Sequence, residues 1–208
     1  GDHRDLHPRA RRQRQMCIRD RIRGLNKASS NAQDGISAIQ TAEGALNEAH
    51  SILQRMNELA TQSANDTNTT ADRTAVQSEV NALTNELSRI ASTSQFNTQN
   101  LLDGTFTGKN LQVGALENQK ITISIGTMNA KALGVDSLNV KSFTKAGSAM
   151  TLIQKAISKV SGQRSDLGAL QNRLEHTVNN LDNISENTQT AESRIRCLLY
   201  TSDAADEL

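Results

Sequence analysis

One long stretch decides the fold of this chain: Ala28–Ser63, which reads ASSNAQDGISAIQTAEGALNEAHSILQRMNELATQS. Apolar and small residues recur in it at alternating steps of four and three, a period that is typical of a helix buried along one seam. Such a helix is stable only with companions, and a weaker stripe through Ile36, Ile52 and Leu59 offers contact to a second neighbour. The seam consists of Ala28, Ala32, Gly35, Ile39, Ala42, Leu46, Ala49, Leu53, Met56, Ala60 and Ser63.

A second helix follows a short turn. The first helix is expected to run from near Ile22 to about Ala64, because the polar cluster at 65–70 favours turns and caps over helix interior. Thr69 or Thr70 can cap the next helix, with Asp72 well placed in its first turn. The seam predicted for this second helix is Val76, Val80, Leu83, Leu87 and Ile90.

A third long helix occupies the C-terminal part of the chain. Ser148 is the residue predicted to cap its N-terminus. Polar residues at 163, 177 and 188 interrupt its seam, either as tolerated defects or as positions that set the helix register. The predicted seam is Ala149, Ile153, Ala156, Val160, Gln163, Leu167, Leu170, Leu174, Thr177, Leu181, Ile184, Thr188, Ala191 and Ile195.

Between the second and third predicted helices, the apolar residues no longer recur with a helical period. Leu111–Val113 and Ile121–Ile125 alternate apolar and polar residues, which predicts two strands of a hairpin joined through Gly114–Lys120. The secondary structure of Met128–Val135 is ambiguous. We therefore predict a mainly α fold, an elongated antiparallel coiled-coil-like bundle of three long helices with a small β-hairpin element. Its parts are N-terminal helices at 21–95, a β/turn insert at 96–147 and a C-terminal helix at 148–196.

Both ends of the chain look foreign to this pattern. Arg11–Asp20 reads RRQRQMCIRD and Cys197–Glu207 reads CLLYTSDAADE, and the two correspond to translations of the two strands of one transposase-type sequencing adapter. We therefore expect residues 1–20 and 197–208 to be translated adapter sequence from library preparation and to be disordered. They are left out of the fold prediction.

The charge and residue content of the body exclude several classes of function. The whole chain carries +1 at pH 7, and residues 22–196 are neutral, with 16 basic and 16 acidic residues, so nothing favours nucleic acid or an anionic membrane surface. No apolar run approaches the ~20 residues of a membrane span. The body has no cysteine, and its two histidines, His50 and His176, lie far apart. We expect no catalytic site, no metal, no cofactor and no enzyme.

Several stretches around the first turn resemble bacterial flagellins. They are RGLNKASSNAQDGISAIQTAEGAL at Arg23–Leu46, LQRMNELATQSANDTNT at Leu53–Thr69, QSEVNALTNELSRIASTSQFN at Gln77–Asn97 and QRSDLGALQNR at Gln163–Arg173.

The resemblance implies a structural subunit of the flagellar filament that supports motility by assembling with copies of itself. It also implies an extracellular place in the bacterial flagellum, export without a cleaved signal peptide and an export chaperone as a further partner. The segments that form the inner tube of a flagellin filament are expected to be missing here, so the chain alone should stay largely monomeric.

One surface patch is a candidate contact site. Arg55, Leu59 and Gln62 are spaced to share one face of the first helix, and an Arg beside an exposed Leu is typical of an interface hot spot. The resemblance adds Glu58 and, on the second helix, Glu79, and it implies that this surface contacts either Toll-like receptor 5 or neighbouring filament subunits.

Two other proteins share parts of the pattern. The hook–filament junction protein has the same helical core, and a chemoreceptor signalling hairpin also has long Ala- and Gln-rich heptads. SQFNTQNLLDG at Ser94–Gly104 favours a flagellin over the junction protein. The strand pattern at Leu111–Ile125 argues against a continuous helical hairpin.

Overall fold

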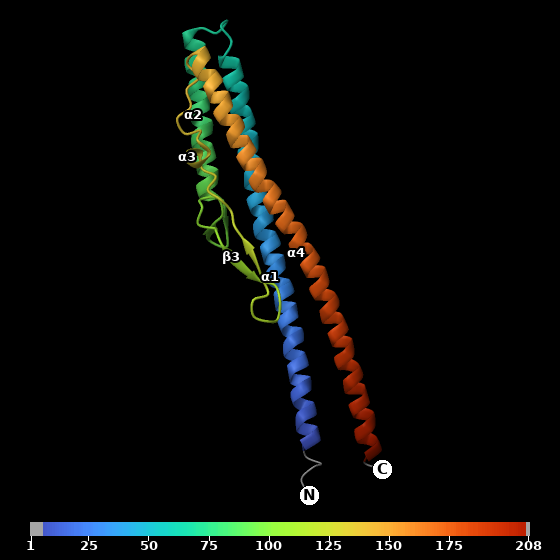
Figure 1. The fold of residues 1–208 in the computed structure, drawn as a ribbon. Helices are drawn as coiled ribbons and strands as arrows, with labels where there is room; N and C mark the ends of the chain where they lie inside the picture. Colours follow the sequence, from blue (N-terminus) through green and yellow to red (C-terminus); the bar gives the residue numbers. More distant parts are fainter. Residues whose placement is uncertain (1–5, 207–208) are drawn as a thin grey trace. The chain divides into compact units, whose positions relative to one another are not determined.

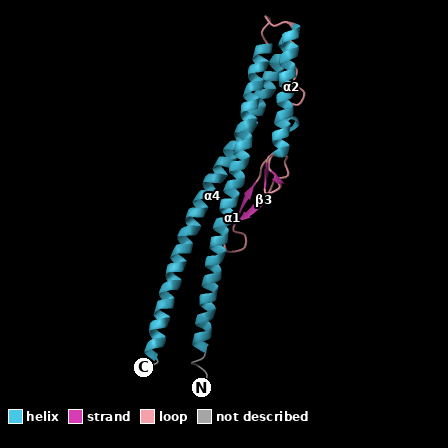
Figure 2. Cartoon of the chain, turned by 180° about the vertical axis from the view of Figure 1, so that it is seen from behind, coloured by secondary structure: helices cyan, strands magenta, loops and turns pink. Residues whose placement is uncertain are grey.

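Four helices and two short strand pairs make up the described part of the chain, residues 6–206 (Figures 1 and 2). The computed structural model describes the backbone of residues 6–206 and the side chains of residues 16–196. The helices are α1 (Leu6–Ser63), α2 (Thr70–Thr93), α3 (Ala130–Leu133) and α4 (Phe143–Asp206). The strands are β1 (Gln95–Phe96), β2 (Gln99–Asn100), β3 (Lys109–Gln112) and β4 (Lys120–Ile123).

These elements form two compact units. The first unit consists of residues 1–36, 110–121 and 172–208, and the second of residues 37–109 and 122–171. α1 and α4 therefore contribute a segment to each unit, whereas α2 and α3 belong to the second unit alone. The mainly helical fold with a small β element is as predicted.

The second unit is built on the predicted seam of α1. All its members from Ile39 to Ser63 are buried, and Ile39, Leu46, Leu53 and Met56 are fully so. α4 packs against this helix in the antiparallel sense. Thr61 of α1 contacts Met150 near the start of α4, and Glu43, earlier in α1, lies beside Gly168, later in α4.

The predicted seam of α2 is confirmed at Val80 and Leu87 and is displaced by one residue at its two ends. Val76, Leu83 and Ile90 are only half-buried, whereas Gln77, Val80, Leu87 and Ala91 are buried. A buried amide is tolerated only with hydrogen-bond partners, and Gln77 has them. Its Oε1 accepts from the N–H of Val140 at 2.8 Å and its Nε2 donates to the carbonyl of Leu138 at 2.9 Å.

The helix ends follow local hydrogen bonds. Thr69 is the N-cap of α2 and forms a capping box with Asp72, as predicted. The cap expected at Ser148 is wrong, because α4 already begins at Phe143. Its first turn is bonded to Ser142, whose carbonyl accepts from Ala146 and whose hydroxyl accepts from Lys145.

The outer ends of α1 and α4 are longer than expected. The sequence predicts disorder over 1–20 and 197–208, whereas the structure places residues 6–20 in α1 and 197–206 in α4. Residues 9–23 contain only helix-compatible residues, without glycine or proline, and Pro8 lies in the first turn, where proline is tolerated. Residues 1–5 and 207–208 lie outside the described backbone. The origin of these ends and the domain limits stay predictions.

The insert contains the predicted hairpin and two elements that were not predicted. β3 pairs with β4, and Val113 donates to the carbonyl of Gln119 at 2.9 Å across the connection. β1 and β2 are antiparallel around Asn97 and Thr98, which both have positive φ. The ambiguous stretch contains α3, capped by Asn129 and ended by Gly134 at φ 76°.

Gln163 connects α4 to the insert and does not merely interrupt a seam. Its side-chain oxygen accepts from the N–H of Gly126 at 3.1 Å and its amide donates to the carbonyl of Ser124 at 3.4 Å. Lys159, one turn earlier on α4, donates to the carbonyl of Ala132 at 2.8 Å. The interpretation of Gln163 as a tolerated defect is therefore wrong, since its bonds anchor the insert to α4.

The first unit pairs the N-terminal part of α1 with the C-terminal part of α4. One small apolar cluster in it consists of Leu25, Ala28 and Leu181, with Ala115 packed against them. Ala32, Ile121 and Leu174 of the same unit are buried as well. Polar contacts take over beyond Leu181, toward the C-terminal end of α4. Ser185 donates to Asn26 at 2.6 Å.

Glu192 is the second buried polar residue on this part of α4. Arg19 lies 2.9 Å away and Arg196 2.7 Å. Hydrogen bonds from Arg19 and Arg196 hold the pKa of the Glu192 carboxyl below its ordinary value, so the buried carboxyl stays charged and paired.

The predicted seam of α4 is wrong beyond Leu181. Ile184 and Ile195 are 37% and 41% exposed, whereas Ser185 and Glu192 are buried in their place. A straight α-helix has 3.6 residues per turn, so a strict 3.5-residue pattern drifts around it by ~20° per heptad. Over a helix as long as α4, this drift displaces the inward positions by one residue.

Candidate interaction surface

Arg55 lies at the centre of an ion-pair cluster that joins α1 to α2. Its guanidinium contacts Glu79 of α2 at 2.9 Å and Glu58 of α1 at 3.1 Å. All three side chains stay substantially exposed, at 51%, 46% and 68% for Arg55, Glu79 and Glu58. Hydrogen bonds to Glu79 and Glu58 raise the pKa of Arg55. The cluster presents one cation between two carboxylates, a net charge of −1.

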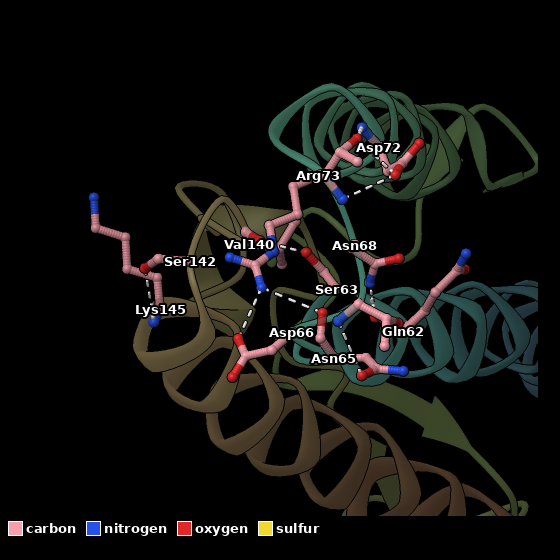
Figure 3. Close-up of polar contacts among 12 residues, drawn as sticks. Gln62, Ser63, Asn65, Asp66, Asn68, Asp72, Arg73, Val140, Ser142 and Lys145 are labelled. Carbon is pink, nitrogen blue, oxygen red and sulfur yellow. Dashed lines mark hydrogen bonds and ion pairs between the residues drawn. The ribbon is translucent and has the colours of Figure 1, made fainter.

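The turn between α1 and α2 brings Glu79 to this position. Arg73 on α2 donates from one guanidinium nitrogen to the carbonyl of Asn65 and to the carboxylate of Asp66, both at 3.2 Å (Figure 3). Asn68 donates to the carbonyl of Gln62. The carbonyls of Gln62 and Asn65 also accept from the backbone N–H groups of Asn65 and Asn68, so side-chain and backbone bonds together give the turn a defined geometry.

Four of the five predicted contact residues are exposed. Arg55, Glu58 and Glu79 form the cluster, and Gln62 is exposed in the last turns of α1. Leu59 is different: its side chain is only 1% exposed, packed in the core of the second unit. The predicted hot spot of an Arg beside an exposed Leu is therefore wrong in its apolar half.

Sequence reasoning missed the side chains that hold the insert near this end of α1. Ser63 donates to the carbonyl of Val140 (Figure 3), and Gln77 bonds the backbone of Leu138 and Val140. Gln77 stands one position from Val76 in the predicted seam. Gln77 precedes Val80 by three residues and so shares its side of the helix, but its bonding partners in the insert leave no signal in a single sequence.

No metal or membrane site is found in the described part of the chain. No group of three or more His, Cys, Asp or Glu side chains there could hold a metal ion. None of the described helices is long and apolar enough to cross a membrane. The exposed charged side chains of the second unit, such as Arg55, Glu58 and Glu79, can form polar and ionic contacts with another macromolecule.

Two family models match the chain. The bacterial flagellin N-terminal helical region matches residues 10–107, and the bacterial flagellin C-terminal helical region matches residues 150–207. Together they cover most of the described helices.

Sequence relatives and a solved structure agree with these models. The chain is 52% identical to a flagellin of Halalkalibacterium halodurans, over 86% of this chain and 66% of that protein. It is 47% identical to the flagellar filament 33 kDa core protein of Treponema phagedenis, over 91% of this chain and 72% of that protein. The crystal structure of Bacillus cereus flagellin superposes with a TM-score of 0.65 at 32% identity, over 73% of this chain and 88% of that one.

The chain spans just under two thirds of the length of the first of these relatives and more of the others. The relatives are flagellins and a filament core protein, which confirms the resemblance inferred from Leu53–Thr69 and its flanks. The chain belongs to the bacterial flagellins, structural proteins of the flagellar filament and not enzymes.

Proposed function

We propose that this chain packs against copies of itself through the exposed helix faces of its second unit, and that Arg55, Glu58, Gln62 and Glu79 form a contact surface. The observation that carries the proposal is the bridge from Arg55 to carboxylates on two helices. An ion-pair network with defined geometry offers a partner a charge pattern that is already ordered before binding.

Toll-like receptor 5 is the second partner that we propose for the same surface. The resemblance of Leu53–Thr69 to the corresponding stretch of flagellins supports it, and the exposure of Arg55, Glu58 and Gln62 leaves these side chains accessible. Leu59 takes no part in this proposal because it is buried.

Binding of the chain to the receptor ectodomain tests the receptor proposal. Arg55→Ala should lower the affinity at least about thirtyfold, which corresponds to the ~2 kcal/mol loss that marks a hot-spot residue. Arg89→Ala is a matched control, because Arg89 forms the same kind of exposed pair, with Glu86 at 2.5 Å. Equal affinities of the wild-type chain and Arg55→Ala would remove the receptor proposal.

Self-association is tested by sedimentation velocity at chain concentrations up to the millimolar range. Because the chain alone is expected to be largely monomeric, we expect weak, reversible association, seen as an increase in the sedimentation coefficient toward the upper end of this range. Arg55→Ala should shift this increase to higher concentration, whereas Arg89→Ala should not. A chain that stays monomeric throughout the range would contradict the self-packing proposal.

We also propose export to the outside of the cell without cleavage of a signal peptide, assisted by an export chaperone. The family's place in the flagellum supports this route. Mass spectrometry of the protein recovered from flagella tests it: the encoded N-terminal peptide should be intact. A uniform truncation at a small-residue cleavage site would contradict the proposal.

A further inference from the structure

The segment that leads into α4 and the first six turns of this helix carry only basic charges. Residues 141–165 contain Lys141, Lys145, Lys155, Lys159 and Arg164 and no acidic residue. Residues 22–196 are neutral as a whole, so the rest of this body carries more acidic than basic residues. The sign of charge is therefore unevenly distributed over the molecule, which matters for what each face can contact.

Four residues of this segment form one exposed face, which we call the basic face of α4. They are Lys145, Ser148, Leu152 and Lys155, spaced three or four apart so that they lie along one side of the helix. Leu152 is 41% exposed between the two lysines. Figure 3 shows the side chain of Lys145 extending away from the neighbouring polar residues. Lys145 and Lys155 form no ion pair with any residue that the structure describes.

The outer side of α1 in the same unit carries the opposite charge. Glu48, Ser51, Arg55 and Glu58 are exposed and spaced three or four apart, and Glu79 of α2 joins them through Arg55. We call these five residues the acidic face of α1. Arg55 neutralises one of its three carboxylates, so the face has a net charge of −2.

A glycine beside the acidic face permits close approach. Gly44 lies one turn before Glu48, and a Cβ at this position would meet no atom of the chain within 4 Å. Glycine inside a helix costs roughly 1 kcal/mol relative to alanine. Gly147 and Gly162 are equally open, so what distinguishes Gly44 is its position beside Glu48, where a second helix approaching from outside would meet no side chain.

We propose that the basic face of α4 docks on the acidic face of α1 in a second copy of the chain. This inference rests on the proposed function, since it names the two surfaces through which copies pack. An apolar Leu152 flanked by two unpaired lysines matches a partner with a small residue and free carboxylates, and Gly44 with Glu48 provides both. The contact joins two different faces, so copies that do not pair reciprocally each keep one face free for a further copy, as an open polymer requires.

Zero-length carbodiimide cross-linking of the whole chain tests this pairing. Equal amounts of unlabelled and 15N-labelled chain are mixed, and cross-linked peptides that combine both isotopes report contacts between copies. Mixed-isotope peptides should join Lys145 or Lys155 to Glu48, Glu58 or Glu79. Because exposed charges are screened over about 8–10 Å at physiological ionic strength, 0.5 M NaCl should lower their yield several-fold.

Charge reversal identifies the faces. Lys155→Glu and Glu48→Lys should each lower the yield of mixed-isotope peptides at least fivefold, and mixing the two variants with each other should restore it. Lys131→Glu, at an exposed position of α3 outside both faces, is the control and should leave the yield unchanged. Circular dichroism should show the same helix content for all variants, because the changed side chains are exposed.

The outcomes separate this inference from the function on which it rests. Copies that associate in sedimentation but cross-link at other residues, or an unchanged yield for both reversed variants, would overturn the pairing of these faces and leave self-association intact. The absence of association at millimolar concentration would overturn both. Binding of a polyanion such as heparin to the basic face, without cross-links between copies, would also overturn the inference.

Discussion

Ser29 of α1 donates a hydrogen bond to the carboxylate of Asp182 of α4 at 2.9 Å, across 153 residues of sequence. One turn away, Ser185 of α4 donates to Asn26 of α1. Ser29 and Ser185 are only 6% and 8% exposed. In a helix pair whose apolar cluster is small, such polar pairs are satisfied in one register only, so they oppose sliding of one helix along the other.

A double-mutant cycle with Ser29→Ala and Asp182→Ala should reveal a coupling of about 1 kcal/mol in the free energy of unfolding, the usual net value of one hydrogen bond. Urea unfolding followed by circular dichroism measures it. Ser30→Ala is the matched control, since Ser30 bonds only the carbonyl of Asn26 in its own helix. Coupling of Asp182 to Ser30 as large as to Ser29 would contradict the pairing.

Gln77 should contribute more to the free energy of unfolding than any of the half-buried residues of the predicted α2 seam, which are Val76, Leu83 and Ile90. Gln77→Ala leaves the N–H of Val140 and the carbonyl of Leu138 without their side-chain partner in a buried site. Each orphaned group costs about 1–3 kcal/mol, so unfolding should become easier by at least about 2 kcal/mol. Urea unfolding measures the loss.

The control for Gln77 is Asn81→Ala. Asn81 is exposed and accepts a bond from the Gln77 amide, but it touches no insert backbone through an observed bond. Its removal should cost under about 1 kcal/mol. If both variants lose the same stability, the bonds to Leu138 and Val140 are not what makes Gln77 important.

Helix periodicity predicted the long-range packing of α1 because one seam was both apolar and continuous. Ile39, Leu46, Leu53 and Met56 are all fully buried. The same method failed where polar residues are buried with specific partners. Gln77 and Ser185 occupy inward positions only because Val140 and Asn26 are there to bond them, and a single sequence does not reveal such pairs.

The sequence predicted which charged residues lie on the candidate surface, but it did not predict that Leu59 is buried beneath them. Spacing along α1 places Arg55 and Glu58 on one side, and the turn at 65–69 brings Glu79 into reach. Leu59 shares that spacing but packs inward. A helix with two neighbours buries a wide arc, and how wide it is depends on where α2 and the insert lie, which periodicity leaves open.

The capping box of α2 makes its first turn sensitive to acid. The Asp72 carboxylate accepts from the Thr69 hydroxyl at 2.7 Å and from its N–H at 2.9 Å, and these bonds lower the pKa of Asp72. A lowered pKa in the folded chain means that the stabilisation is complete above the ordinary carboxyl pKa. It is lost as the pH falls through the folded value.

NMR titration of the Asp72 side-chain carboxyl should give a pKa below 3.8, the ordinary value of an aspartate. Thr69→Ala should bring it back toward that value and cost about 1 kcal/mol of stability. Asp136, which lies outside the capping box, serves as the reference signal. An Asp72 pKa that Thr69→Ala leaves unchanged would show that the cap does not cause the shift.

Two helical glycines should respond to alanine in opposite ways. A Cβ at Gly162 would meet nothing within 4 Å, so Gly162→Ala should stabilise the chain by about 0.5–1 kcal/mol through helix propensity alone. At Gly35 a Cβ would lie 2.2 Å from Cδ1 of Leu111 and 3.4 Å from Cδ1 of Leu174. Gly35→Ala must displace Leu111 from its packing against α1, which offsets the propensity gain.

We therefore expect Gly35→Ala to be at least about 1 kcal/mol less favourable than Gly162→Ala, because displacing a packed side chain typically costs 1–3 kcal/mol. Thermal and urea unfolding of both variants measure the difference. Gly35→Ala combined with Leu111→Ala removes the clash, so adding Gly35→Ala to the Leu111→Ala background should stabilise as Gly162→Ala does in the wild type. Equal gains for Gly35→Ala and Gly162→Ala in the wild-type chain would show that Leu111 does not pack over Gly35.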